Sequence, residues 1–381
     1  MSIFQRMLAS GAAKTISGRM SPSMRQFFVT TFAPRLSRQN FRAAMRGSLA
    51  NSDAILRRLK SSRKDVTCPL ILISQVQRSG GSLLSQLFDG HSRILAHPQE
   101  LKIGYPSKEI WPPIHSSLSA NKQFAILFES STIPMCELGY AKGKRDLERK
   151  NFFFIPAMQR ELFRHVSEEM GRATPRQTLN AYFTSYFNSW LNLKLDISRG
   201  QYVTGFVPLM VNDRSNMDHY WTTYPDGHLI SVIRSPLSWY PSAFRLLGGK
   251  KYGDIELGAT RWCESTRAIM REKEQYPDRV TVIHFNDLVT RTEAVMRLVC
   301  QRLSLPFEPI LLQPTFNGEL MGANTSFDQV ERGTISSAPT TRHEHLSEDD
   351  RLYLERHCMP LYQQALDKAA EMLPDVKEAS E

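Results

Sequence analysis

An arginine and a pair of glycines follow the first strongly apolar segment of the chain. The sequence reads "PLILISQVQRSGGSLLSQLF" over residues 69–88, so Arg78, Gly80 and Gly81 stand between an apolar run and a leucine-rich segment. A strand that turns directly into a helix leaves the first helical N–H groups unpaired, and these groups bind anions together with the helix dipole. Glycines let the backbone approach an oxyanion closely, and an arginine adds a charged fork. The segment therefore predicts a site for phosphate or a similar anion.

A second segment repeats this arrangement further along the chain. "HLISVIRSPLSWYPSAF" (228–244) again runs from an apolar stretch through Arg234 to a helical pattern, with Pro236 suited to the first helical position. Ser242 stands eight residues after Arg234, about two helical turns, and could face the same pocket mouth. An arginine and a hydroxyl so placed would bind a second phosphate. Two such sites predict a ligand with two separated anionic groups.

The elements that must position these residues alternate between strand and helix patterns. Short apolar runs predict strands at 68–76, 201–211, 228–235 and 280–288. Helical patterns lie at 81–90, 174–193, 235–247 and 263–275, mostly helical patterns fill 105–200, and one long helix begins near Ser347, with Asp350 three residues on. This alternation predicts an α/β fold, a parallel sheet flanked by helices with a P-loop-like strand–loop–helix. Ligands of such sheets bind beyond the carboxyl ends of the strands.

The basic residues of the chain are concentrated at its amino end. Of 381 residues, the first 64 hold 13 lysines and arginines and one acid, Asp53, although the whole chain has a net charge of +10. We therefore predict a basic, partly helical arm at 1–66 and one α/β domain at 67–381. The arm could contact an anionic membrane or another polyanion, serve as an organelle transit segment, or only add solubility. No alternation of aromatic and basic residues marks a single-strand groove, which argues against nucleic acid.

Cysteines and histidines give no sign of a metal site or of disulfides. The five cysteines are widely spaced, without a C-x-x-C pair, and the ten histidines form no H-E-x-x-H motif. No apolar run reaches the roughly 18–20 residues of a membrane-spanning helix. These features predict a protein without a metal in a reducing compartment, by default the cytoplasm.

A magnesium-dependent nucleotide kinase is the first alternative interpretation. Its loop has the pattern G-x-x-x-x-G-K-[ST], in which the lysine reaches the phosphates and the hydroxyl binds magnesium. The loop at 75–82 contains no lysine, which argues against this alternative. A non-enzymatic nucleotide-binding or scaffold protein, with the arm engaging a membrane or polyanion, is the second alternative.

Both arginine loops resemble the donor-binding motifs of sulfotransferases. "QRSGGSLLSQLFDGH" is similar to the 5′-phosphosulfate loop of that family, "VIRSPLSWYPSAF" to its 3′-phosphate motif, and "PTFNGELMGANTSF" (314–327) to a segment of bacterial members. The resemblance implies a donor, 3′-phosphoadenosine 5′-phosphosulfate (PAPS), and transfer of its sulfuryl group to an acceptor without a metal. Many members have threonine where Gly81 stands and aspartate where Ser235 stands.

The resemblance also implies roles for individual residues. The 5′ phosphosulfate would be surrounded by Arg78, Ser79, Gly80, Gly81, Ser82 and Leu83. The 3′-phosphate would be held by Arg234 and Ser242, with Arg332 and Gly333 in "VERGTISS" as the counterpart of a late loop. Relatives use a glutamate or a histidine shortly after the first loop as the base that takes the acceptor proton.

Two residues compete for the role of this base. Glu100, 22 residues beyond Arg78, is the favoured candidate and His97 the alternative, although Glu100 could instead pair with Lys102. Arg78 would stabilise charge in the transition state. We expect a carbohydrate hydroxyl as acceptor, ahead of a lipid or a small alcohol. Stacking on Trp111, Trp190 or Trp239, or attraction to Lys250 and Lys251, would suit a sugar, but packing or a solvated surface is the more common role of such residues.

Overall fold

The chain forms one central parallel sheet with helices on both faces. The computed structural model describes residues 53–101, 110–129, 131–141, 149–247, 254–322, 331–338, 340–341, 346–371 and 373. Residues 1–52, with most of the basic arm, and Lys102, Lys250 and Lys251 lie outside the described residues. The strands are β1 (Leu70–Ile73), β2 (Ile94–Glu100), β3 (Tyr202–Phe206), β4 (His228–Ile233) and β5 (Val280–His284).

The order of the strands places β1 at the centre. The sheet runs β2-β3-β1-β4-β5, and every neighbouring pair is parallel. The connection from β1 leads to one side of the sheet, whereas the connection from β3 crosses β1 to reach β4. The carboxyl ends of β1 and β4 are therefore neighbours at a switch point of the topology, where open α/β sheets bind ligands. The predicted α/β fold is confirmed.

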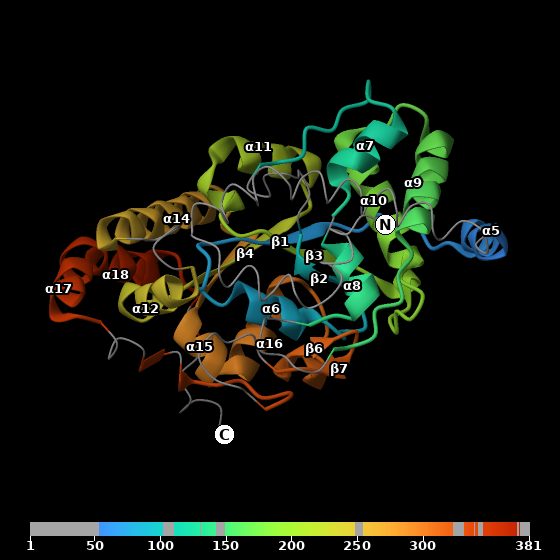
Figure 1. Cartoon of the computed structure of the whole chain (residues 1–381). Coiled ribbons are helices and arrows are strands. Elements are labelled where there is room, and N and C mark those ends of the chain that lie inside the picture. Colours follow the sequence, from blue (N-terminus) through green and yellow to red (C-terminus); the bar gives the residue numbers. More distant parts are fainter. Residues whose placement is uncertain are drawn as a thin grey trace, which may run out of the picture.

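Helices cover both faces of the sheet (Figure 1), and an apolar core lies under the helices on each face. Alternate residues of β1 enter different cores: Leu70 and Leu72 pack with one, Ile71 and Ile73 with the other. The Ile71 side is covered by α6 (Gly81–Phe88), α15 (Phe285–Thr290) and α16 (Thr292–Arg302). The Leu70 side is covered by α11 (Arg214–Thr223), α12 (Pro236–Leu247), α14 (Ile255–Gln275) and the helices of residues 105–200.

The described parts of the helical insertion predicted at 105–200 contain helices joined by irregular segments. The insertion contains α7 (Ala120–Leu127), α8 (Thr132–Leu138), α9 (Pro156–Met170), α10 (Pro175–Ser189) and the 3-10 turn η1 (Ile197–Arg199). Helix α10 begins at Pro175 with a capping box, in which the Thr174 hydroxyl accepts from the Gln177 N–H. Its aromatic stripe is buried, as are Trp111, Trp190 and Trp239, so these tryptophans serve packing.

Several sequence predictions need correction. The segment 94–100 was not predicted to be a strand but forms β2, since Pro98 disguises a strand that lies at the sheet edge. The predicted strand 201–211 ends at Phe206 and continues into the 3-10 turn η2 (Met210–Asn212). The long carboxyl-terminal helix is divided at Cys358, because Pro360 has no N–H to continue the hydrogen bonding. Its predicted cap is confirmed: the Ser347 hydroxyl accepts from the Asp350 N–H at 3.1 Å.

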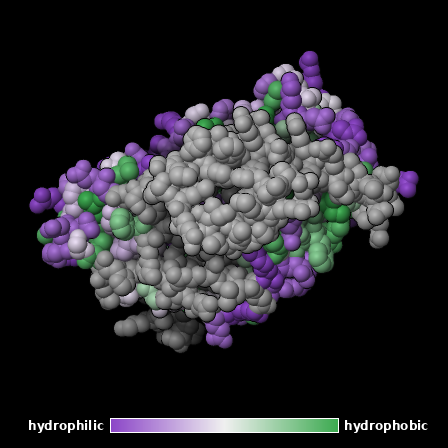
Figure 2. Space-filling view, viewed as in Figure 1, coloured by the Kyte–Doolittle hydropathy of each residue, from purple (hydrophilic) through white to green (hydrophobic). Residues whose placement is uncertain are grey.

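The remaining elements lie toward the chain ends. They are α5 (Asp53–Ser62), η3 (Pro309–Leu312), β6 (Thr315–Phe316), β7 (Glu319–Leu320), α17 (Glu348–His357) and α18 (Met359–Lys368). Strands β6 and β7 form a hairpin whose turn residues, Asn317 and Gly318, both have positive φ, as a type I′ turn requires. In the face seen in Figure 2, hydrophobic residues reach the surface as small separate patches among hydrophilic ones.

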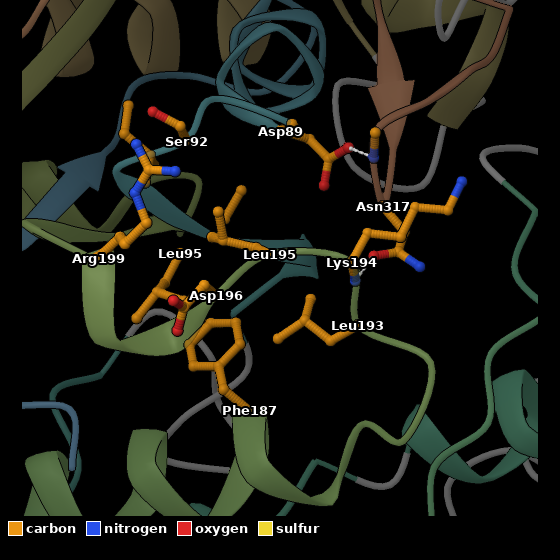
Figure 3. A pocket seen from close by; sticks show the side chains of 14 residues that line it. Asp89, Ser92, Leu95, Phe187, Leu193, Lys194, Leu195, Asp196, Arg199 and Asn317 are labelled. Carbon is orange, nitrogen blue, oxygen red and sulfur yellow. Dashed lines mark hydrogen bonds between the residues drawn. The ribbon is translucent and has the colours of Figure 1, made fainter. Parts of the chain in front are cut away.

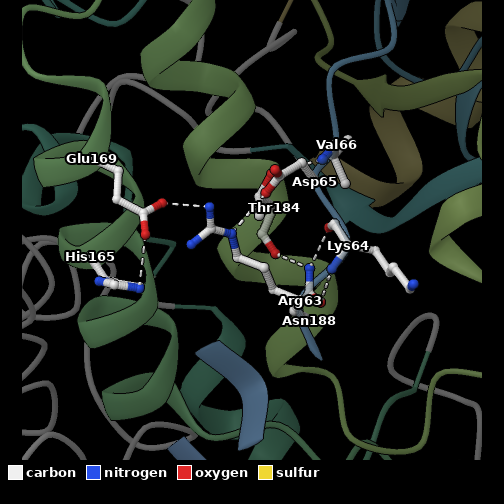
Figure 4. Close-up of polar contacts among 8 residues, drawn as sticks. All are labelled: Arg63, Lys64, Asp65, Val66, His165, Glu169, Thr184 and Asn188. Carbon is white, nitrogen blue, oxygen red and sulfur yellow. Dashed lines mark hydrogen bonds and ion pairs between the residues drawn. The ribbon is translucent and has the colours of Figure 1, made fainter. Parts of the chain in front are cut away.

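The last residues of the predicted arm are bound to the helical insertion (Figure 4). The Val66 N–H donates to the Thr184 hydroxyl at 2.8 Å, and Asn188 both accepts from the Lys64 N–H and donates to the Lys64 carbonyl oxygen. Arg63 forms an ion pair with Glu169 of α9. The segment 63–66 is thus fixed to α9 and α10 next to the predicted boundary at residue 66.

Candidate active site

The two arginine loops predicted from the sequence are in direct contact. Arg234 Nη1 donates a hydrogen bond to the Arg78 carbonyl oxygen at 3.0 Å, and Trp239 Nε1 donates to the Gln77 carbonyl oxygen at 2.7 Å. The loops meet because β1 and β4 pair in the sheet, with Ile73 opposite Ile230. Both anion-binding patterns therefore lie side by side at the carboxyl-terminal ends of the sheet strands.

Three further contacts fix the Arg234 side chain and backbone in place. Its Nε donates to the Ser238 hydroxyl at 3.1 Å, and its guanidinium carbon lies 4.5 Å from the centre of the Phe285 ring. Trp262 Nε1 donates to the Arg234 carbonyl oxygen at 3.0 Å. Arg234 is only 2% exposed, so its guanidinium is held in one position at the loop and has little contact with water. Such preorganised charge is typical of an anion site.

The first loop has the backbone conformation that its glycines predict. Gly80 precedes the first residue of α6 with φ 104°, a conformation that side chains rarely adopt. Arg78 also has positive φ, 71°, an unusual value for a residue with a side chain. Strain of this kind persists only where the surroundings impose it, and it is common at binding sites.

Gly81 leaves no space for a side chain. A Cβ at this position would lie 2.1 Å from the amide end of Gln75 and 2.4 Å from the Phe206 ring. The Gln75 amide, oriented with its oxygen toward Gly81, accepts from the Gly81 N–H at 3.2 Å and donates to the Ser74 carbonyl oxygen at 3.1 Å. A threonine, which many sulfotransferases have here, would overlap these atoms. Gln75 thus accounts for the glycine at position 81.

The Ser79 hydroxyl is buried within the loop without a hydrogen-bond partner among the described residues. Ser79 is 1% exposed and lies between Arg78 and Gly80. An unpaired buried hydroxyl costs free energy, so natural structures rarely keep one without a ligand or water to bind it.

The other predicted donor-binding residues lie close to these two loops. Ser82 is half-buried in the first turn of α6, while Leu83 packs into the apolar core beside it. Ser242 is completely buried in α12, four residues after Ser238 and therefore on the same helix face. That face carries the hydroxyl that accepts from Arg234.

Glu100 lies at the carboxyl-terminal ends of the strands, as both loops do. It is the last residue of β2 and pairs in register with Phe206, whose ring closes the space beside Gly81. Burial lowers the pKa of the Arg78 guanidinium, and the nearby Glu100 carboxylate opposes this shift. A carboxylate and a half-buried arginine are therefore electrostatic neighbours at the mouth of the loop.

His97 points into the helical insertion instead. It is 2% exposed, its Nε2 lies 3.0 Å from Glu129 Oε1, and its ring centre lies 5.0 Å from that of Tyr186. Its Nδ1 lies 3.1 Å from the Gln99 carbonyl oxygen. The two candidate bases thus have different surroundings, Glu100 beside Arg78 and His97 inside the protein.

The predicted late loop has other neighbours. The Gly333 N–H donates to the Met321 carbonyl oxygen at 2.9 Å, and Gly333 lies against Leu320 of β7. This segment approaches α6 at its second turn, where Gln86 Nε2 donates to the Gly322 carbonyl oxygen at 3.3 Å. Arg332 is exposed beside Gly333, and residues 323–330, which precede this turn, lie outside the described residues.

Sequence reasoning did not single out four residues that shape the site: Gln75, Ser238, Phe285 and Trp262. Ser238 could have been found, since it stands four residues after Arg234, one helical turn away. Gln75 stands in the first loop, but only the folded shape of the loop brings its amide to the Gly81 N–H. Phe285 and Trp262 reach the loops through the packing of separate elements, which leaves no local signal in the sequence.

A cavity of about 300 Å³ lies near the amino-terminal end of β2, away from the arginine loops (Figure 3). It opens between the end of α6, the start of β2 and the β6–β7 hairpin. Its polar groups already have protein partners: Asp89 accepts from the Gly318 N–H, Lys194 pairs with Glu319, and Asn317 accepts from the Lys194 N–H. Because α6 runs back from the arginine loops to the start of β2, the cavity is separate from the candidate site.

The fold and the paired loops define an α/β protein with a P-loop-like anion site at a switch point of a parallel sheet. The sequence profile of the sulfotransferase family matches residues 113–309. The chain belongs to the sulfotransferase family.

Solved structures of sulfotransferases resemble the chain at low identity. The sulfotransferase domain from the curacin biosynthetic pathway is 18% identical, with 82% of this chain and 100% of that domain covered and a TM-score of 0.46. Sulfotransferase STF9 from Mycobacterium avium is 13% identical, with 91% and 88% covered and a TM-score of 0.40. No curated protein sequence matches the chain significantly.

Metal ligands and membrane-spanning helices were also sought in the described part of the chain. There, no three His, Cys, Asp or Glu side chains gather in a way that could bind a metal ion. None of the described helices combines the length and apolar character needed to span a bilayer. The five cysteines, all within the described residues, are free thiols.

Proposed function

We propose that the protein transfers the sulfuryl group of PAPS to an acceptor hydroxyl. The observation that carries this proposal is the hydrogen bond from Arg234 to the Arg78 carbonyl oxygen, which joins two anion-binding loops into one site. A ligand with a phosphosulfate at one end and a 3′-phosphate at the other has the charge distribution that such a pair of loops would bind. Membership of the sulfotransferase family supports the reaction class.

The residues of the first loop fit the 5′ end of this donor. Ser79 offers a buried hydroxyl that lacks a partner among the described residues, and Gly80, with its positive φ, allows the tight turn of the loop. Arg78 and the N–H groups of Ser82 and Leu83, which follow Gly81 in α6, would stabilise negative charge there, as preorganised donors do in phosphoryl transfer. When bound, PAPS supplies the electrophilic sulfur and a stable leaving group.

Arg234 and Ser242 are proposed to bind the 3′-phosphate. Arg234 is held by Ser238 and Phe285, so little conformational entropy remains to be lost when an anion binds. Arg332 and Gly333 are proposed to extend this phosphate site as the late loop.

Glu100 is proposed to take the proton of the acceptor hydroxyl. It stands beside Arg78, at the edge where the sulfur would lie, whereas both nitrogens of His97 already face protein oxygens. We predict that Glu100→Gln lowers the rate by about 10²- to 10⁴-fold, the usual contribution of a general base, and leaves donor affinity unchanged. Single-turnover kinetics combined with calorimetry would measure both quantities, and wild-type activity in this variant would remove Glu100 from the reaction.

A carbohydrate hydroxyl is the proposed acceptor, and the helical insertion at 105–200 is proposed to select it. The buried tryptophans give this choice no support, so it depends on a direct screen. Labelled PAPS offered with saccharides, lipids and small alcohols would identify the acceptor class.

The amino-terminal arm is proposed to bring the enzyme to an anionic membrane or polyanion.

Calorimetry with adenosine 3′,5′-bisphosphate and with ATP, each with and without magnesium, tests the proposal against its alternatives. Tight binding of the bisphosphate without metal supports the sulfotransferase. Binding only of ATP with magnesium would indicate a nucleotide kinase, and binding of neither nucleotide would indicate a non-enzymatic role.

A further inference from the structure

A buried polar chain connects the helical insertion to the end of β2. Tyr182 of α10 donates its hydroxyl hydrogen to Glu129 Oε1 at 3.1 Å, and the same oxygen lies 3.0 Å from His97 Nε2. Glu129 and His97 are 1% and 2% exposed. Burial and the charge of Glu129 raise the pKa of Tyr182 well above its usual value, so this hydroxyl remains a donor.

The other nitrogen of His97 bonds to the backbone of its own strand. Its Nδ1 lies 3.1 Å from the Gln99 carbonyl oxygen. A carbonyl oxygen can only accept, so Nδ1 must carry the proton. Nε2 lies 3.0 Å from Glu129 Oε1, an ion-pair contact by distance that lacks hydrogen-bond geometry. His97 is therefore oriented by Glu129 and in turn holds the carbonyl group that directly precedes Glu100.

The bonded segment is the irregular part of β2. Pairing with β3 shifts register between Ala96 and Glu100, so the strand cannot rely on regular ladder hydrogen bonds there. A second side chain also holds it, since the Tyr140 hydroxyl donates to the Pro98 carbonyl oxygen at 2.7 Å. Regular pairing resumes when the Leu101 N–H donates to the Phe206 carbonyl oxygen at 2.8 Å. Glu100 is thus positioned by side chains from outside its strand.

We infer that His97 is a positioning residue for Glu100, through its bond to the Gln99 carbonyl oxygen, and that Glu129 keeps the imidazole in the required orientation. This inference rests on the proposed role of Glu100. It assigns to His97 a function different from that of the base, because neither nitrogen is available to an acceptor. A displacement of about 1 Å at a reacting group can cost about 10²-fold in rate.

Two variants of His97 separate the two bonds. In His97→Asn, the amide nitrogen lies near the position of Nδ1 and can still donate to Gln99. In His97→Gln, the amide lies near the position of Nε2 and keeps only the contact with Glu129. Each variant loses one buried polar contact, so the two should lose similar stability. Glu129→Gln can donate its amide hydrogen to Nε2 and should preserve the orientation of the ring.

The first readout is hydrogen–deuterium exchange of residues 94–101 in the full chain, which requires no donor or acceptor. We expect faster exchange at Leu101 in His97→Gln than in His97→Asn, at equal melting temperature. The second is PAPS turnover, with water and a panel of saccharides as acceptors. The expected kcat loss is about 10- to 100-fold for His97→Gln and clearly smaller for His97→Asn and Glu129→Gln, with bisphosphate affinity unchanged in all three.

Different failures have different meanings. Equal exchange and equal kcat in the two His97 variants would overturn the inference, and so would a loss in Glu129→Gln as large as that in Glu100→Gln. If the His97 variants do not fold, Glu129→Leu, which removes the contact with Nε2, takes their place: faster exchange at Leu101 than in Glu129→Gln supports the inference, and equal exchange overturns it. If the wild-type protein neither binds the bisphosphate nor turns over PAPS, the proposed function fails, while the exchange experiment still tests the positioning contact.

Discussion

Substitution of Gly80 by alanine should damage stability and donor binding together. Gly80 has φ 104°, which costs an L-residue about 1–2 kcal/mol. The new Cβ would also lie 2.8 Å from Phe285 Cδ2 and 3.0 Å from Cε2, and overpacking of this kind costs about 1–3 kcal/mol. The two contributions predict a loss of about 2–5 kcal/mol in the free energy of unfolding. Because Phe285 lies under the Arg234 guanidinium, movement of its ring should also displace Arg234.

Gly171 provides a matched control for this experiment. It also has positive φ, 66°, but a Cβ there would meet no atom within 4 Å. Gly171→Ala should therefore cost only the conformational part, about 1–2 kcal/mol. The effect of alanine on the entropy of the unfolded chain is common to both variants and cancels in the comparison.

Urea denaturation and calorimetry with adenosine 3′,5′-bisphosphate would measure the two effects. We expect Gly80→Ala to lose about 1–3 kcal/mol more stability than Gly171→Ala and to bind the bisphosphate at least about tenfold more weakly, since 1.4 kcal/mol corresponds to one factor of ten. Gly171→Ala should bind it as the wild type does. If the two variants match in stability and in affinity, the assignment of Phe285 as the support of Arg234 is refuted.

Three further predictions follow from other contacts. Ser79→Ala should leave stability unchanged or raise it by up to about 1 kcal/mol, because it removes an unpaired buried hydroxyl, but it should weaken bisphosphate binding. The control Ser265→Ala removes another such hydroxyl, in α14, and should leave bisphosphate binding unchanged. Calorimetry and urea melts check both, and parallel effects in the two variants would contradict a donor-binding role for Ser79. Arg234→Lys should weaken bisphosphate binding by about 10- to 100-fold through lost charged hydrogen bonds, whereas Arg297→Lys, on the exposed side of α16, should bind normally; equal affinities would count against Arg234 as a ligand. Burial, aided by nearby arginines, lowers the pKa of His228 in the folded protein below its unfolded value of about 6.5. The unfolded state therefore binds more protons in acid, and the free energy of unfolding should fall from pH 7 toward pH 5. Urea melts across this range should show a shallower fall for His228→Gln, and an identical slope would refute the assignment.

The sequence predicted the local structure around the site well. Residues next to one another decide a strand–loop–helix, so the glycines of the first loop, Pro236 at the start of α12 and the cap at Ser347 could be predicted. Strand β2 was not predicted because Pro98 opposes regular strand pairing. A proline is tolerated in β2 because the strand order makes β2 an outer strand of the sheet.

The sequence by itself determined the α/β fold and the two arginine loops, since backbone sterics, capping and hydrophobic periodicity act over a few residues. Only the tertiary structure decided that these loops touch, because their strands, separated by more than 150 residues of chain, become neighbours through the order of the sheet. It also decided that Gln75 fills the space beside Gly81 and that Phe285 supports Arg234. It separated Glu100 from His97, although the two stand three residues apart, because successive side chains of a strand leave on opposite faces and the bulge turns the last one toward Arg78.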